Sequence, residues 1–547
     1  MPTVDASLKD LQALVGRRLN RAQLEDALLY SKSELDACEG DALRIDVKDT
    51  NRPDLWSAEG IARELRARLG IERGLPKIRV SRGKTKLFVE RSVKDVRPLI
   101  AACVARNVKV TENFLVQMIQ LQEKVGENFG RRRAEVAIGI YDFDKMKPPI
   151  YYRACKPREL KFVPLEFRQE MDLDEILELH PKGKEYANLL KGAKEYPIVI
   201  DSAGTVASMP PVINSEATGK VGTGTRNLFV EVTGMKPENV ITALNVMAAA
   251  LAERGARLET IEVSYAGGKS WHTPDFRPKK ISVGIDYVRK IAGMQFSAAE
   301  IKELLKSARC EPHIKGGEME VYYPAYRNDV LHAADIAEDV VISCGYNKIE
   351  PTEIKMPVRG SALAQGAIND MAREACIGLG LQEVLTFTMT SKEKQGKMLG
   401  LHGEEFAEIE NYMSLSYQIF RRRILPELLE FLNRNKRYAY PQDIFEVGKA
   451  VLLDNASETG VDEQEHLCIV LCGKDADFTK IKSHLDAVCK AMGRKYSLKE
   501  RAEPFLEKGR SAEIHAGNKR GIIGELNKET LKNFGLEMPV AVLEMEI

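Results

Sequence analysis

Short apolar runs recur between residues 76 and 268, and no other feature of the sequence constrains the fold as strongly. The runs that resemble strands are 86–90, 100–105, 136–140, 197–201 and 227–233. Amphipathic patterns over about 113–129 and about 237–254 predict helices among them. Strands mixed with helices over this length predict one α+β domain.

Three further regions flank this domain. Residues 1–75 contain two helical patterns, a strand and a third helical pattern, which predicts an N-terminal α/β module. Residues 275–352 predict a small helix-rich domain with a hairpin at Gly316. Residues 358–547 alternate between strands and helices. We therefore expect a multidomain α+β protein, and four domains agree with 547 residues at about 100–200 residues per domain.

Composition and motifs exclude several classes of protein. The formal net charge is +1, which does not by itself indicate a nucleic-acid-binding protein. The longest apolar stretches, such as 99–105 and 246–252, are much shorter than the about 20 residues that span a membrane. The chain has no GxxxxGK[ST] loop, no GxGxxG that opens a βαβ unit and no GxSxG, so a self-contained ATPase, dehydrogenase or serine hydrolase is not expected.

The cysteines and the N-terminus predict a cytoplasmic location. Nine cysteines are scattered along the chain without a CxxC pair, which is typical of reduced thiols. The first ten residues have neither an apolar core nor a basic cluster, so they do not form a secretory signal.

Four carboxylates are spaced to converge without an obvious basic partner. If 331–344 is a helix, then Asp335, Glu338 and Asp339 share one face, and Asp329 lies in the preceding turn. A hard divalent cation such as Mg²⁺ would relieve their mutual repulsion. The spacing also fits a second interpretation, in which acids early in a helix are solvated and favour the helix dipole.

A stiff loop and a strand form a second candidate site. The loop is Pro210–Ser215, and the strand follows Thr225. Within the strand, Phe229 and Glu231 point to the same side because side chains alternate. Glu231 is thereby placed to face a pocket, although a glutamate at a sheet edge that is merely solvated is the alternative interpretation.

Taken in order, segments over most of the chain resemble the phenylalanyl-tRNA synthetase β-subunit family, in its archaeal and eukaryotic form. The segments that carry the resemblance are Ile45–Leu65, with its NRPDL string, Arg132–Asp144, Pro210–Ser215, Thr225–Thr233, Pro324–Asp329, Asp335–Asp339, Gly345–Asn347, Leu425–Leu429, Ile444–Gly448 and Gly509–Glu513. Two strings that look like class II synthetase motifs, Phe167–Glu170 and Gly222–Arg226, lie outside the catalytic-like region, and we interpret them as coincidence.

The resemblance implies a division of labour between two subunits. An α subunit would bind ATP and phenylalanine, and two αβ pairs would form an (αβ)₂ heterotetramer that charges tRNA(Phe). Residues 358–547 of this chain would form a class II synthetase-like core, built on an antiparallel sheet and lacking the catalytic motifs. The small domain at 275–352 would be DNA-binding-like in fold. It would hold Mg²⁺, shared with the α subunit, through Asp329, Asp335, Glu338 and Asp339.

The resemblance also implies that residues 76–268 hydrolyse mischarged Tyr-tRNA(Phe). Such proofreading is needed because an apolar pocket shaped for phenylalanine cannot strongly reject a side chain that adds a hydroxyl group. Glu231 is the candidate for recognising that hydroxyl. The other expected members of the editing pocket are Ser208, Asn214, Ser215 and Thr225. Arg131–Arg133 and Arg421–Arg423 are candidates for contacts with tRNA phosphates.

Two alternatives to a synthetase subunit are distinguishable. A free-standing tRNA deacylase would act without a partner, and it would not need residues 358–547. A non-catalytic protein that binds DNA through residues 275–352 is the other alternative, and the near-neutral charge argues against it.

Overall fold

The computed structural model describes residues 2–351, 353 and 359–547. It contains two compact units, Met1–Glu353 and Ile354–Ile547, each with its own hydrophobic cores. Helices and strands are mixed in both units, which confirms the predicted α+β class. Within the described residues, no helix is both long enough and apolar enough to cross a membrane.

The N-terminal module is a three-stranded antiparallel sheet with three helices. The strand order is β1-β3-β2. The elements are β1 (Thr3–Ser7), α1 (Leu8–Val15), α2 (Arg21–Leu29), β2 (Ser33–Glu39), β3 (Ala42–Val47) and α3 (Ala58–Arg68). The first helix begins only at Leu8, because residues 3–7 pair with β3. The side chain of Ser7 then caps α1 by accepting a hydrogen bond from the backbone N–H of Asp10.

An eleven-stranded sheet forms the largest part of the first unit. Its main path runs β13-β12-β11-β8-β5-β15-β6-β14-β7, and β4 and β16 pair with β15. The strands are β4 (Val80–Ser81), β5 (Lys86–Val89), β6 (Leu99–Arg106), β7 (Val136–Asp142), β8 (Ile150–Cys155), β11 (Tyr196–Asp201), β12 (Val206–Met209), β13 (Ile213–Asn214), β14 (Leu228–Gly234), β15 (Arg257–Tyr265) and β16 (Ser270–Thr273). All five strand-like runs of the sequence contribute to this sheet.

Helices and a small hairpin complete the large domain. They are α4 (Glu112–Lys124), with a π-helical turn Val125–Phe129 after it, β9 (Lys161–Phe162), β10 (Met171–Asp172), α5 (Leu173–Leu179), α6 (Pro181–Tyr186), α7 (Glu216–Gly219) and α8 (Pro237–Glu253). Helix α8 packs on β6 and β14. One continuous core extends from this face into the N-terminal module, and it includes Trp56, Val230 and Ala249. The two regions therefore share buried surface.

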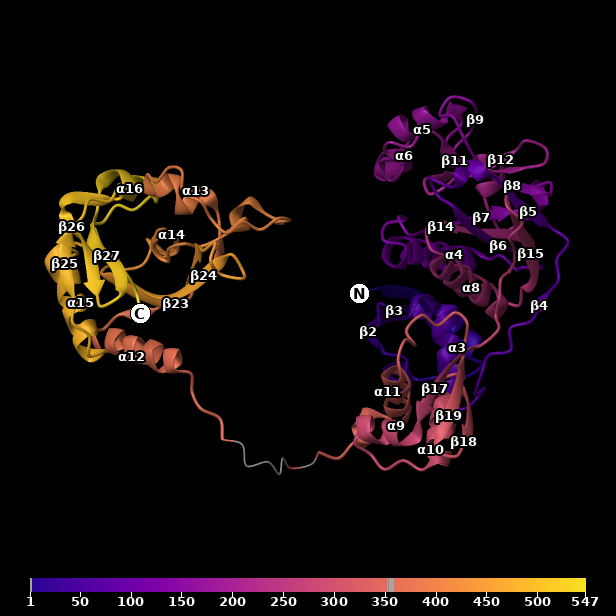
Figure 1. Ribbon diagram of the computed structural model, residues 1–547, viewed down its shortest axis with the longest axis horizontal. Coiled ribbons are helices and arrows are strands. Elements are labelled where there is room, and N and C mark those ends of the chain that lie inside the picture. The colour runs from indigo at the N-terminus through magenta and orange to yellow at the C-terminus, as the bar shows by residue number, and fades with distance from the viewer. Residues whose placement is uncertain (1, 352, 354–358) are drawn as a thin grey trace. The chain divides into compact units, whose positions relative to one another are not determined.

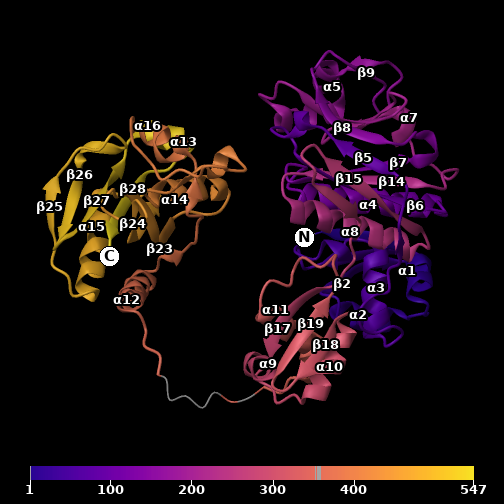
Figure 2. The same ribbon diagram turned by 45° about the vertical axis from the view of Figure 1, so that its right-hand side comes forward.

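A three-stranded sheet and three helices follow. Their elements are β17 (Lys279–Gly284), α9 (Ile285–Ala292), α10 (Ala298–Ser307), β18 (Glu311–Lys315), β19 (Glu318–Tyr323) and α11 (Ala333–Cys344), with strand order β17-β19-β18. In two views 45° apart, the N-terminal module lies between this part and the large sheet (Figure 1, Figure 2). The predicted hairpin at Gly316 is confirmed, and Gly316 has a φ of 64°, a left-handed conformation that suits glycine.

The second unit is built on a seven-stranded sheet, order β20-β23-β24-β28-β27-β26-β25, in which only the β20–β23 pair is parallel. Its larger elements are α12 (Ala364–Gly378), β20 (Gln382–Glu383), α14 (Leu425–Asn435), β23 (Gln442–Leu453), β24 (Val461–Cys472), α15 (Phe478–Ala491), β25 (Ser497–Glu500), β26 (Leu506–Ala516), β27 (Lys519–Leu526) and β28 (Val540–Glu546). Its short elements are β21 (Met389–Thr390), α13 (Lys392–Gln395), β22 (Ile419–Phe420) and α16 (Lys528–Asn533). Helices α12 and α15 cover one face of the sheet, and α14 covers the other.

Candidate functional site

A cavity of about 430 Å³ opens in the large domain, between α4, the end of β12 and the strands β7 and β14. Much of its wall is apolar and includes Met118, Ile138, Ile140 and Val212. Its polar lining residues are Gln122, Glu123, Arg133, Glu166, His180, Lys182, Ser208, Asn214, Glu216, Lys220 and Glu231. An apolar enclosure with a few fixed polar groups is the usual form of a small-molecule site.

Glu231 is the most unusual group of this cavity. It lies on β14 and is 2% exposed. Its Oε1 accepts a hydrogen bond of 2.9 Å from the hydroxyl of Tyr141, whereas its Oε2 is buried and has no hydrogen-bond partner among the described residues. Burial raises the pKa of Glu231 to about 7, although the hydrogen bond from Tyr141 and the charge of Arg97 both act to lower it. The carboxyl group is thus held in an environment that ionisation disfavours.

Two more of the five expected residues line the same cavity. Ser208 is buried on β12, and its Oγ lies 2.8 Å from the hydroxyl oxygen of Tyr141. Asn214, on β13, donates its side-chain N–H to the carbonyl of Ile140 at 3.4 Å. The structure thus brings Ser208, Asn214 and Glu231 together from three strands.

Ser215 and Thr225 are not among the cavity-lining residues. The Ser215 hydroxyl caps α7 by accepting from the backbone N–H of Thr218, and it also lies 3.1 Å from the Thr218 hydroxyl. Thr225 donates its hydroxyl proton to Asp142 at 3.1 Å. Both side chains hold the loop in place behind the cavity.

Three contacts at the site were not anticipated from the sequence. Tyr141 is fully buried beside Glu231. His180 lines the cavity, and its Nδ1 accepts the backbone N–H of Lys182, so its Nε2 donates to the carbonyl of Leu165 at 3.2 Å. Arg133 donates to the carbonyl oxygens of the 211–212 loop at 3.2 and 3.0 Å. The partners of Tyr141 and Arg133 lie at least 67 residues away, so no local pattern could reveal them.

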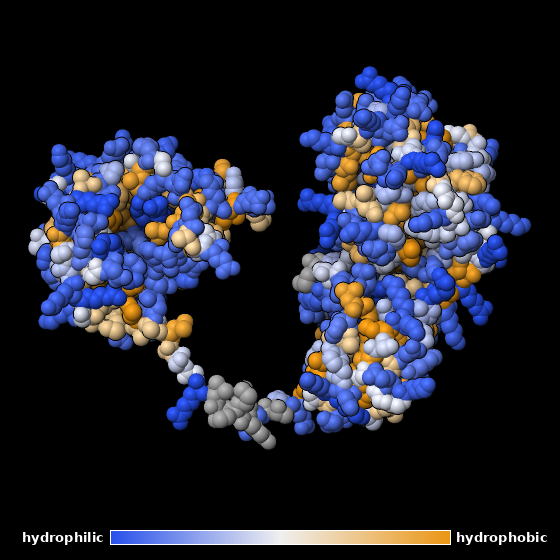
Figure 3. All heavy atoms as spheres, viewed as in Figure 1, coloured by the Kyte–Doolittle hydropathy of each residue, from blue (hydrophilic) through white to orange (hydrophobic). Residues whose placement is uncertain are grey.

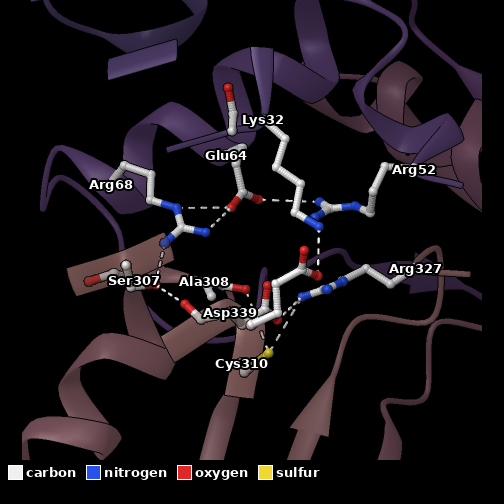
Figure 4. A network of polar contacts seen from close by, with 12 residues as sticks. Lys32, Arg52, Glu64, Arg68, Ser307, Ala308, Cys310, Arg327 and Asp339 are labelled. Atoms are coloured by element: carbon white, nitrogen blue, oxygen red, sulfur yellow. Dashed lines mark hydrogen bonds and ion pairs between the residues drawn. The ribbon is translucent and has the colours of Figure 1, made fainter. Parts of the chain in front are cut away.

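The four acidic residues near position 335 do not form one donor set. Arg327 binds Asp339 at 2.6 Å (Figure 4). It also binds Asp329 bidentately, and Arg52 lies 3.7 Å from Asp329. Burial raises the pKa of Asp329, but the guanidinium groups of Arg327 and Arg52 outweigh it and hold that pKa well below its usual range. Arg327 is therefore the basic partner that the spacing argument overlooked.

The other two carboxylates have different partners. Asp335 accepts the backbone N–H groups of Leu331 and His332 at 2.7 and 2.6 Å, as a capping residue of α11 does. Glu338 pairs with Lys32 of the N-terminal module at 2.9 Å. In the part of the chain that the structure describes, no three His, Cys, Asp or Glu side chains are arranged to hold a metal ion. As placed here, the four residues do not fit a Mg²⁺ site.

The network of Figure 4 continues into the N-terminal module. Glu64 of α3 pairs with Arg68 at 3.0 Å and with Arg52 at 3.5 Å, and Arg68 also donates to Ser343 of α11. Glu64, Arg52 and Arg327 are all buried. An unpaired charge destabilises the fold when it is buried. Because the charges of α3 and α11 neutralise one another through this network, it holds the two helices together.

The two basic triplets differ in how available they are. Arg421 is buried and pairs with Glu446 at 2.7 Å, so it does not present its charge to a ligand. Arg423 is paired with Glu404 at 2.6 Å. Arg131 and Arg132, by contrast, are exposed at the end of the π-helical turn after α4.

Comparisons with known proteins match the whole chain. Three family models match successive regions: the B3/4 domain at 97–265, the tRNA synthetase B5 domain at 281–346, and the phenylalanyl tRNA synthetase beta chain CLM domain at 349–547. The chain is 46% identical to the phenylalanine–tRNA ligase beta subunit of Pyrococcus horikoshii, covering 100% of this chain and 99% of that protein. Identity to the beta subunit of Korarchaeum cryptofilum is 36%, with 100% and 98% covered.

A solved structure agrees with the sequence matches. An N-terminal fragment of the phenylalanyl-tRNA synthetase beta subunit from Pyrococcus horikoshii superimposes with a TM-score of 0.61 at 50% identity, covering 63% of this chain and 100% of the fragment. Sequence identity over nearly the full length, together with three family domains in order, shows common family membership and not only a shared fold. The chain belongs to the phenylalanine–tRNA ligase beta-subunit family.

Proposed function

We propose that this chain works with an α subunit to charge tRNA(Phe), and that its cavity hydrolyses Tyr-tRNA(Phe) made in error. The observation that carries the editing part is Glu231, a buried carboxylate with an unpaired oxygen at an otherwise largely apolar cavity. A tyrosyl side chain offers an apolar ring and one hydroxyl that can donate to that oxygen. A phenylalanyl side chain would leave the oxygen unpaired, which costs binding energy.

The decisive measurement is the hydrolysis of Tyr-tRNA(Phe) and of Phe-tRNA(Phe) by the full chain with its α subunit. We expect the tyrosyl ester to be hydrolysed at least tenfold faster, and Glu231→Gln to remove most of that preference. Glu238→Gln is the matched control, because Glu238 is an exposed residue in the first turn of α8. Equal hydrolysis of both esters, or a preference that survives Glu231→Gln, would contradict the proposal.

The second unit supports a role as one subunit of a larger enzyme. Its surface carries apolar side chains among polar ones (Figure 3), including Leu385 at 88% exposure, Phe387 at 69% and Leu415 at 69%. Phe387 packs against the ring of Tyr417, with centroids 5.8 Å apart. Large exposed apolar side chains that pack together on a surface are typical of interaction sites. We propose the α subunit as the occupant, since the relatives are named as beta subunits and a lone deacylase would have no use for this surface.

Co-purification tests this assignment. The double variant Leu385→Ser, Phe387→Ser should fold normally, because both side chains are exposed, and should lose most of the bound α subunit and of the ATP-dependent charging. Ile377→Ser, which removes another exposed apolar side chain (60%), serves as a comparison for solubility. Undiminished recovery of the α subunit with the double variant would contradict the proposed surface.

The remaining parts of the functional prediction are open to direct measurement. ATP and phenylalanine would bind the α subunit, and Arg131 and Arg132 remain candidates for contacts with tRNA. The cytoplasmic location, inferred from nine scattered cysteines, also stays a prediction. Mg²⁺ at Asp329, Asp335, Glu338 and Asp339 also stays a prediction, although in this structure these side chains pair with Arg327, Lys32 and backbone N–H groups. Equilibrium dialysis of Mg²⁺ against the αβ complex, with and without Glu338→Gln, tests it.

A further inference from the structure

A tyrosine joins two of the polar residues of the cavity, Glu231 and Ser208. Tyr141 lies on β7, and its hydroxyl oxygen is 2.9 Å from Glu231 Oε1 and 2.8 Å from Ser208 Oγ. Its ring packs beside Phe229, with centroids 5.8 Å apart. A phenylalanine would fill the same space, so the hydroxyl is the feature that packing alone does not require.

A glycine leaves room for this contact. In the register of β7 and β14, Gly139 lies directly opposite Glu231. A Cβ at position 139 would come within 2.0 Å of the Tyr141 hydroxyl and within 2.4 Å of Glu231 Oε1. Any side chain here would push the tyrosine and the carboxylate apart. Gly139 therefore leaves the space, and Tyr141 supplies the hydroxyl, for the hydrogen bond to Glu231.

We propose that Tyr141 is a positioning residue for the editing site: its hydroxyl holds Glu231 Oε1, so that Oε2 remains the acceptor for the substrate's hydroxyl, and Gly139 provides the space for this arrangement. This inference rests on the proposed editing function. It assigns to Tyr141 a role exerted through Glu231, because Tyr141 is not among the residues that line the cavity.

The protonation state of Glu231 determines the direction of the hydrogen bonds among Glu231, Tyr141 and Ser208. A tyrosine hydroxyl has one proton, and an ionised carboxylate takes that hydrogen bond. Ser208 then donates to the tyrosine oxygen. When Glu231 is protonated, it donates to Tyr141, which donates to Ser208 instead. Ionisation turns Oε2 from a neutral carbonyl oxygen into a charged and therefore stronger acceptor, so selective hydrolysis should follow the ionisation of Glu231.

Because Glu231 is buried, its pKa is sensitive to the hydrogen bond from the Tyr141 hydroxyl. The groups that act on it are Tyr141 of β7 and Arg97 before β6, and Ser208 of β12 acts through Tyr141. Tyr152 of β8 also lies near, but burial raises its pKa, so it stays uncharged from pH 6 to pH 9. Burial raises the pKa of Glu231 to about 7, and the Tyr141 bond opposes that rise. Removing the hydroxyl should raise the pKa further, because it deletes a bond to the charged form.

The test compares Tyr141→Phe with the unchanged chain, each in complex with its α subunit, from pH 6 to pH 9. For Tyr-tRNA(Phe) we expect kcat/KM at pH 7 to fall about tenfold, in line with loss of one hydrogen bond to a charged group. The midpoint of the pH profile should move to higher pH, and charging with phenylalanine should be unchanged. Gly139→Ala should reproduce the loss, since it displaces the same pair.

Tyr152→Phe is the matched control. Tyr152 is also fully buried, but its hydroxyl donates to the carbonyl of Arg97 at 2.8 Å and not to Glu231. It should leave the pH midpoint in place. If Tyr141→Phe keeps the original rate and midpoint while Glu231→Gln loses selectivity, the inference is overturned. Equal effects of Tyr141→Phe and Tyr152→Phe would also overturn it. If even the unchanged chain fails to prefer the tyrosyl ester, the proposed function falls, and the inference with it.

Discussion

Glu231 is a carboxyl group on a strand whose other side chains are buried as well, and its ionisation affects the stability of the fold. Its folded pKa of about 7 lies above the ordinary value of 4.5. Between these two values the folded state binds the proton and the unfolded state does not, so stability falls as pH rises. The cost is absent below about pH 4.5 and complete above about pH 7.

Glu231→Gln should therefore stabilise the first unit at alkaline pH. The gain relative to the unchanged chain should be near zero at pH 4.5 and reach about 3 kcal/mol at pH 8. Native-state hydrogen exchange at the amides of β14 measures the opening free energy at each pH. A difference that does not grow with pH would contradict the raised pKa.

Arg327 is the residue whose loss should harm the fold most. It neutralises Asp329 and Asp339, and all three side chains are buried. Arg327→Met should cost about 3–5 kcal/mol, because it leaves the buried Asp339 unpaired and leaves Asp329 with Arg52 alone. Arg277→Met, at an exposed pair with Asp275, should change stability by less than about 0.5 kcal/mol. Hydrogen exchange of the α11 amides distinguishes the two variants.

The sequence made Glu231 easier to predict than Tyr141 or Arg327. Glu231 was predictable because a carboxylate interrupts an apolar strand. Tyr141 was not, because an aromatic residue in a strand resembles any core residue until its partners are known, and these are 67 and 90 residues away. Arg327 stands only two residues before Asp329, yet its direction was not readable from spacing. The acidic cluster therefore suggested a metal ion where the fold supplies a guanidinium.

At the level of elements, α3 is fixed by a close approach at its first turn. A Cβ on Gly60 would lie 1.6 Å from the carbonyl oxygen of Asp54. Gly60→Ala should therefore destabilise the N-terminal module by about 3 kcal/mol, because the neighbouring backbone would have to move.

A glycine in another helix provides the opposite case. Gly366 lies in α12, and a Cβ there would meet nothing within 4 Å. Gly366→Ala should stabilise its helix by about 0.5–1 kcal/mol. Melting temperatures of the two variants should move in opposite directions. A shift of the same sign in both would show that the close contact at Gly60 is not the controlling factor.

Helices were better predicted than short strands. The patterns of α2, α3 and α10 depend on apolar spacing within one segment, which the sequence displays directly. Strands β1 and β2 went unrecognised, because each is defined by its pairing with β3. The alternating pattern over 383–388 is typical of a strand, but only 382–383 pair with β23, and Leu385 and Phe387 are exposed instead.

At the scale of the whole molecule, the residues of the proposed editing site all belong to the first unit. We therefore expect a fragment of residues 1–353 to retain hydrolysis of Tyr-tRNA(Phe) and its dependence on Glu231, while it loses all charging activity. The relative that was solved as an N-terminal fragment is consistent with independent folding. The rate of tyrosine release from preformed Tyr-tRNA(Phe) measures this. A fragment that is folded by circular dichroism but inactive would show that the second unit contributes to the site.

The charge network between α3 and α11 also determines when, during synthesis, the N-terminal module can complete its folding. Arg68 and its partner Ser343 are separated by 275 residues. At about 5–20 residues per second, the ribosome needs roughly 14–55 s to make the intervening chain. During that interval the N-terminal module has emerged, but the guanidinium and carboxylate groups that complete its charges do not yet exist. Its final docking is therefore a late event, which must wait until the entire large sheet has been made.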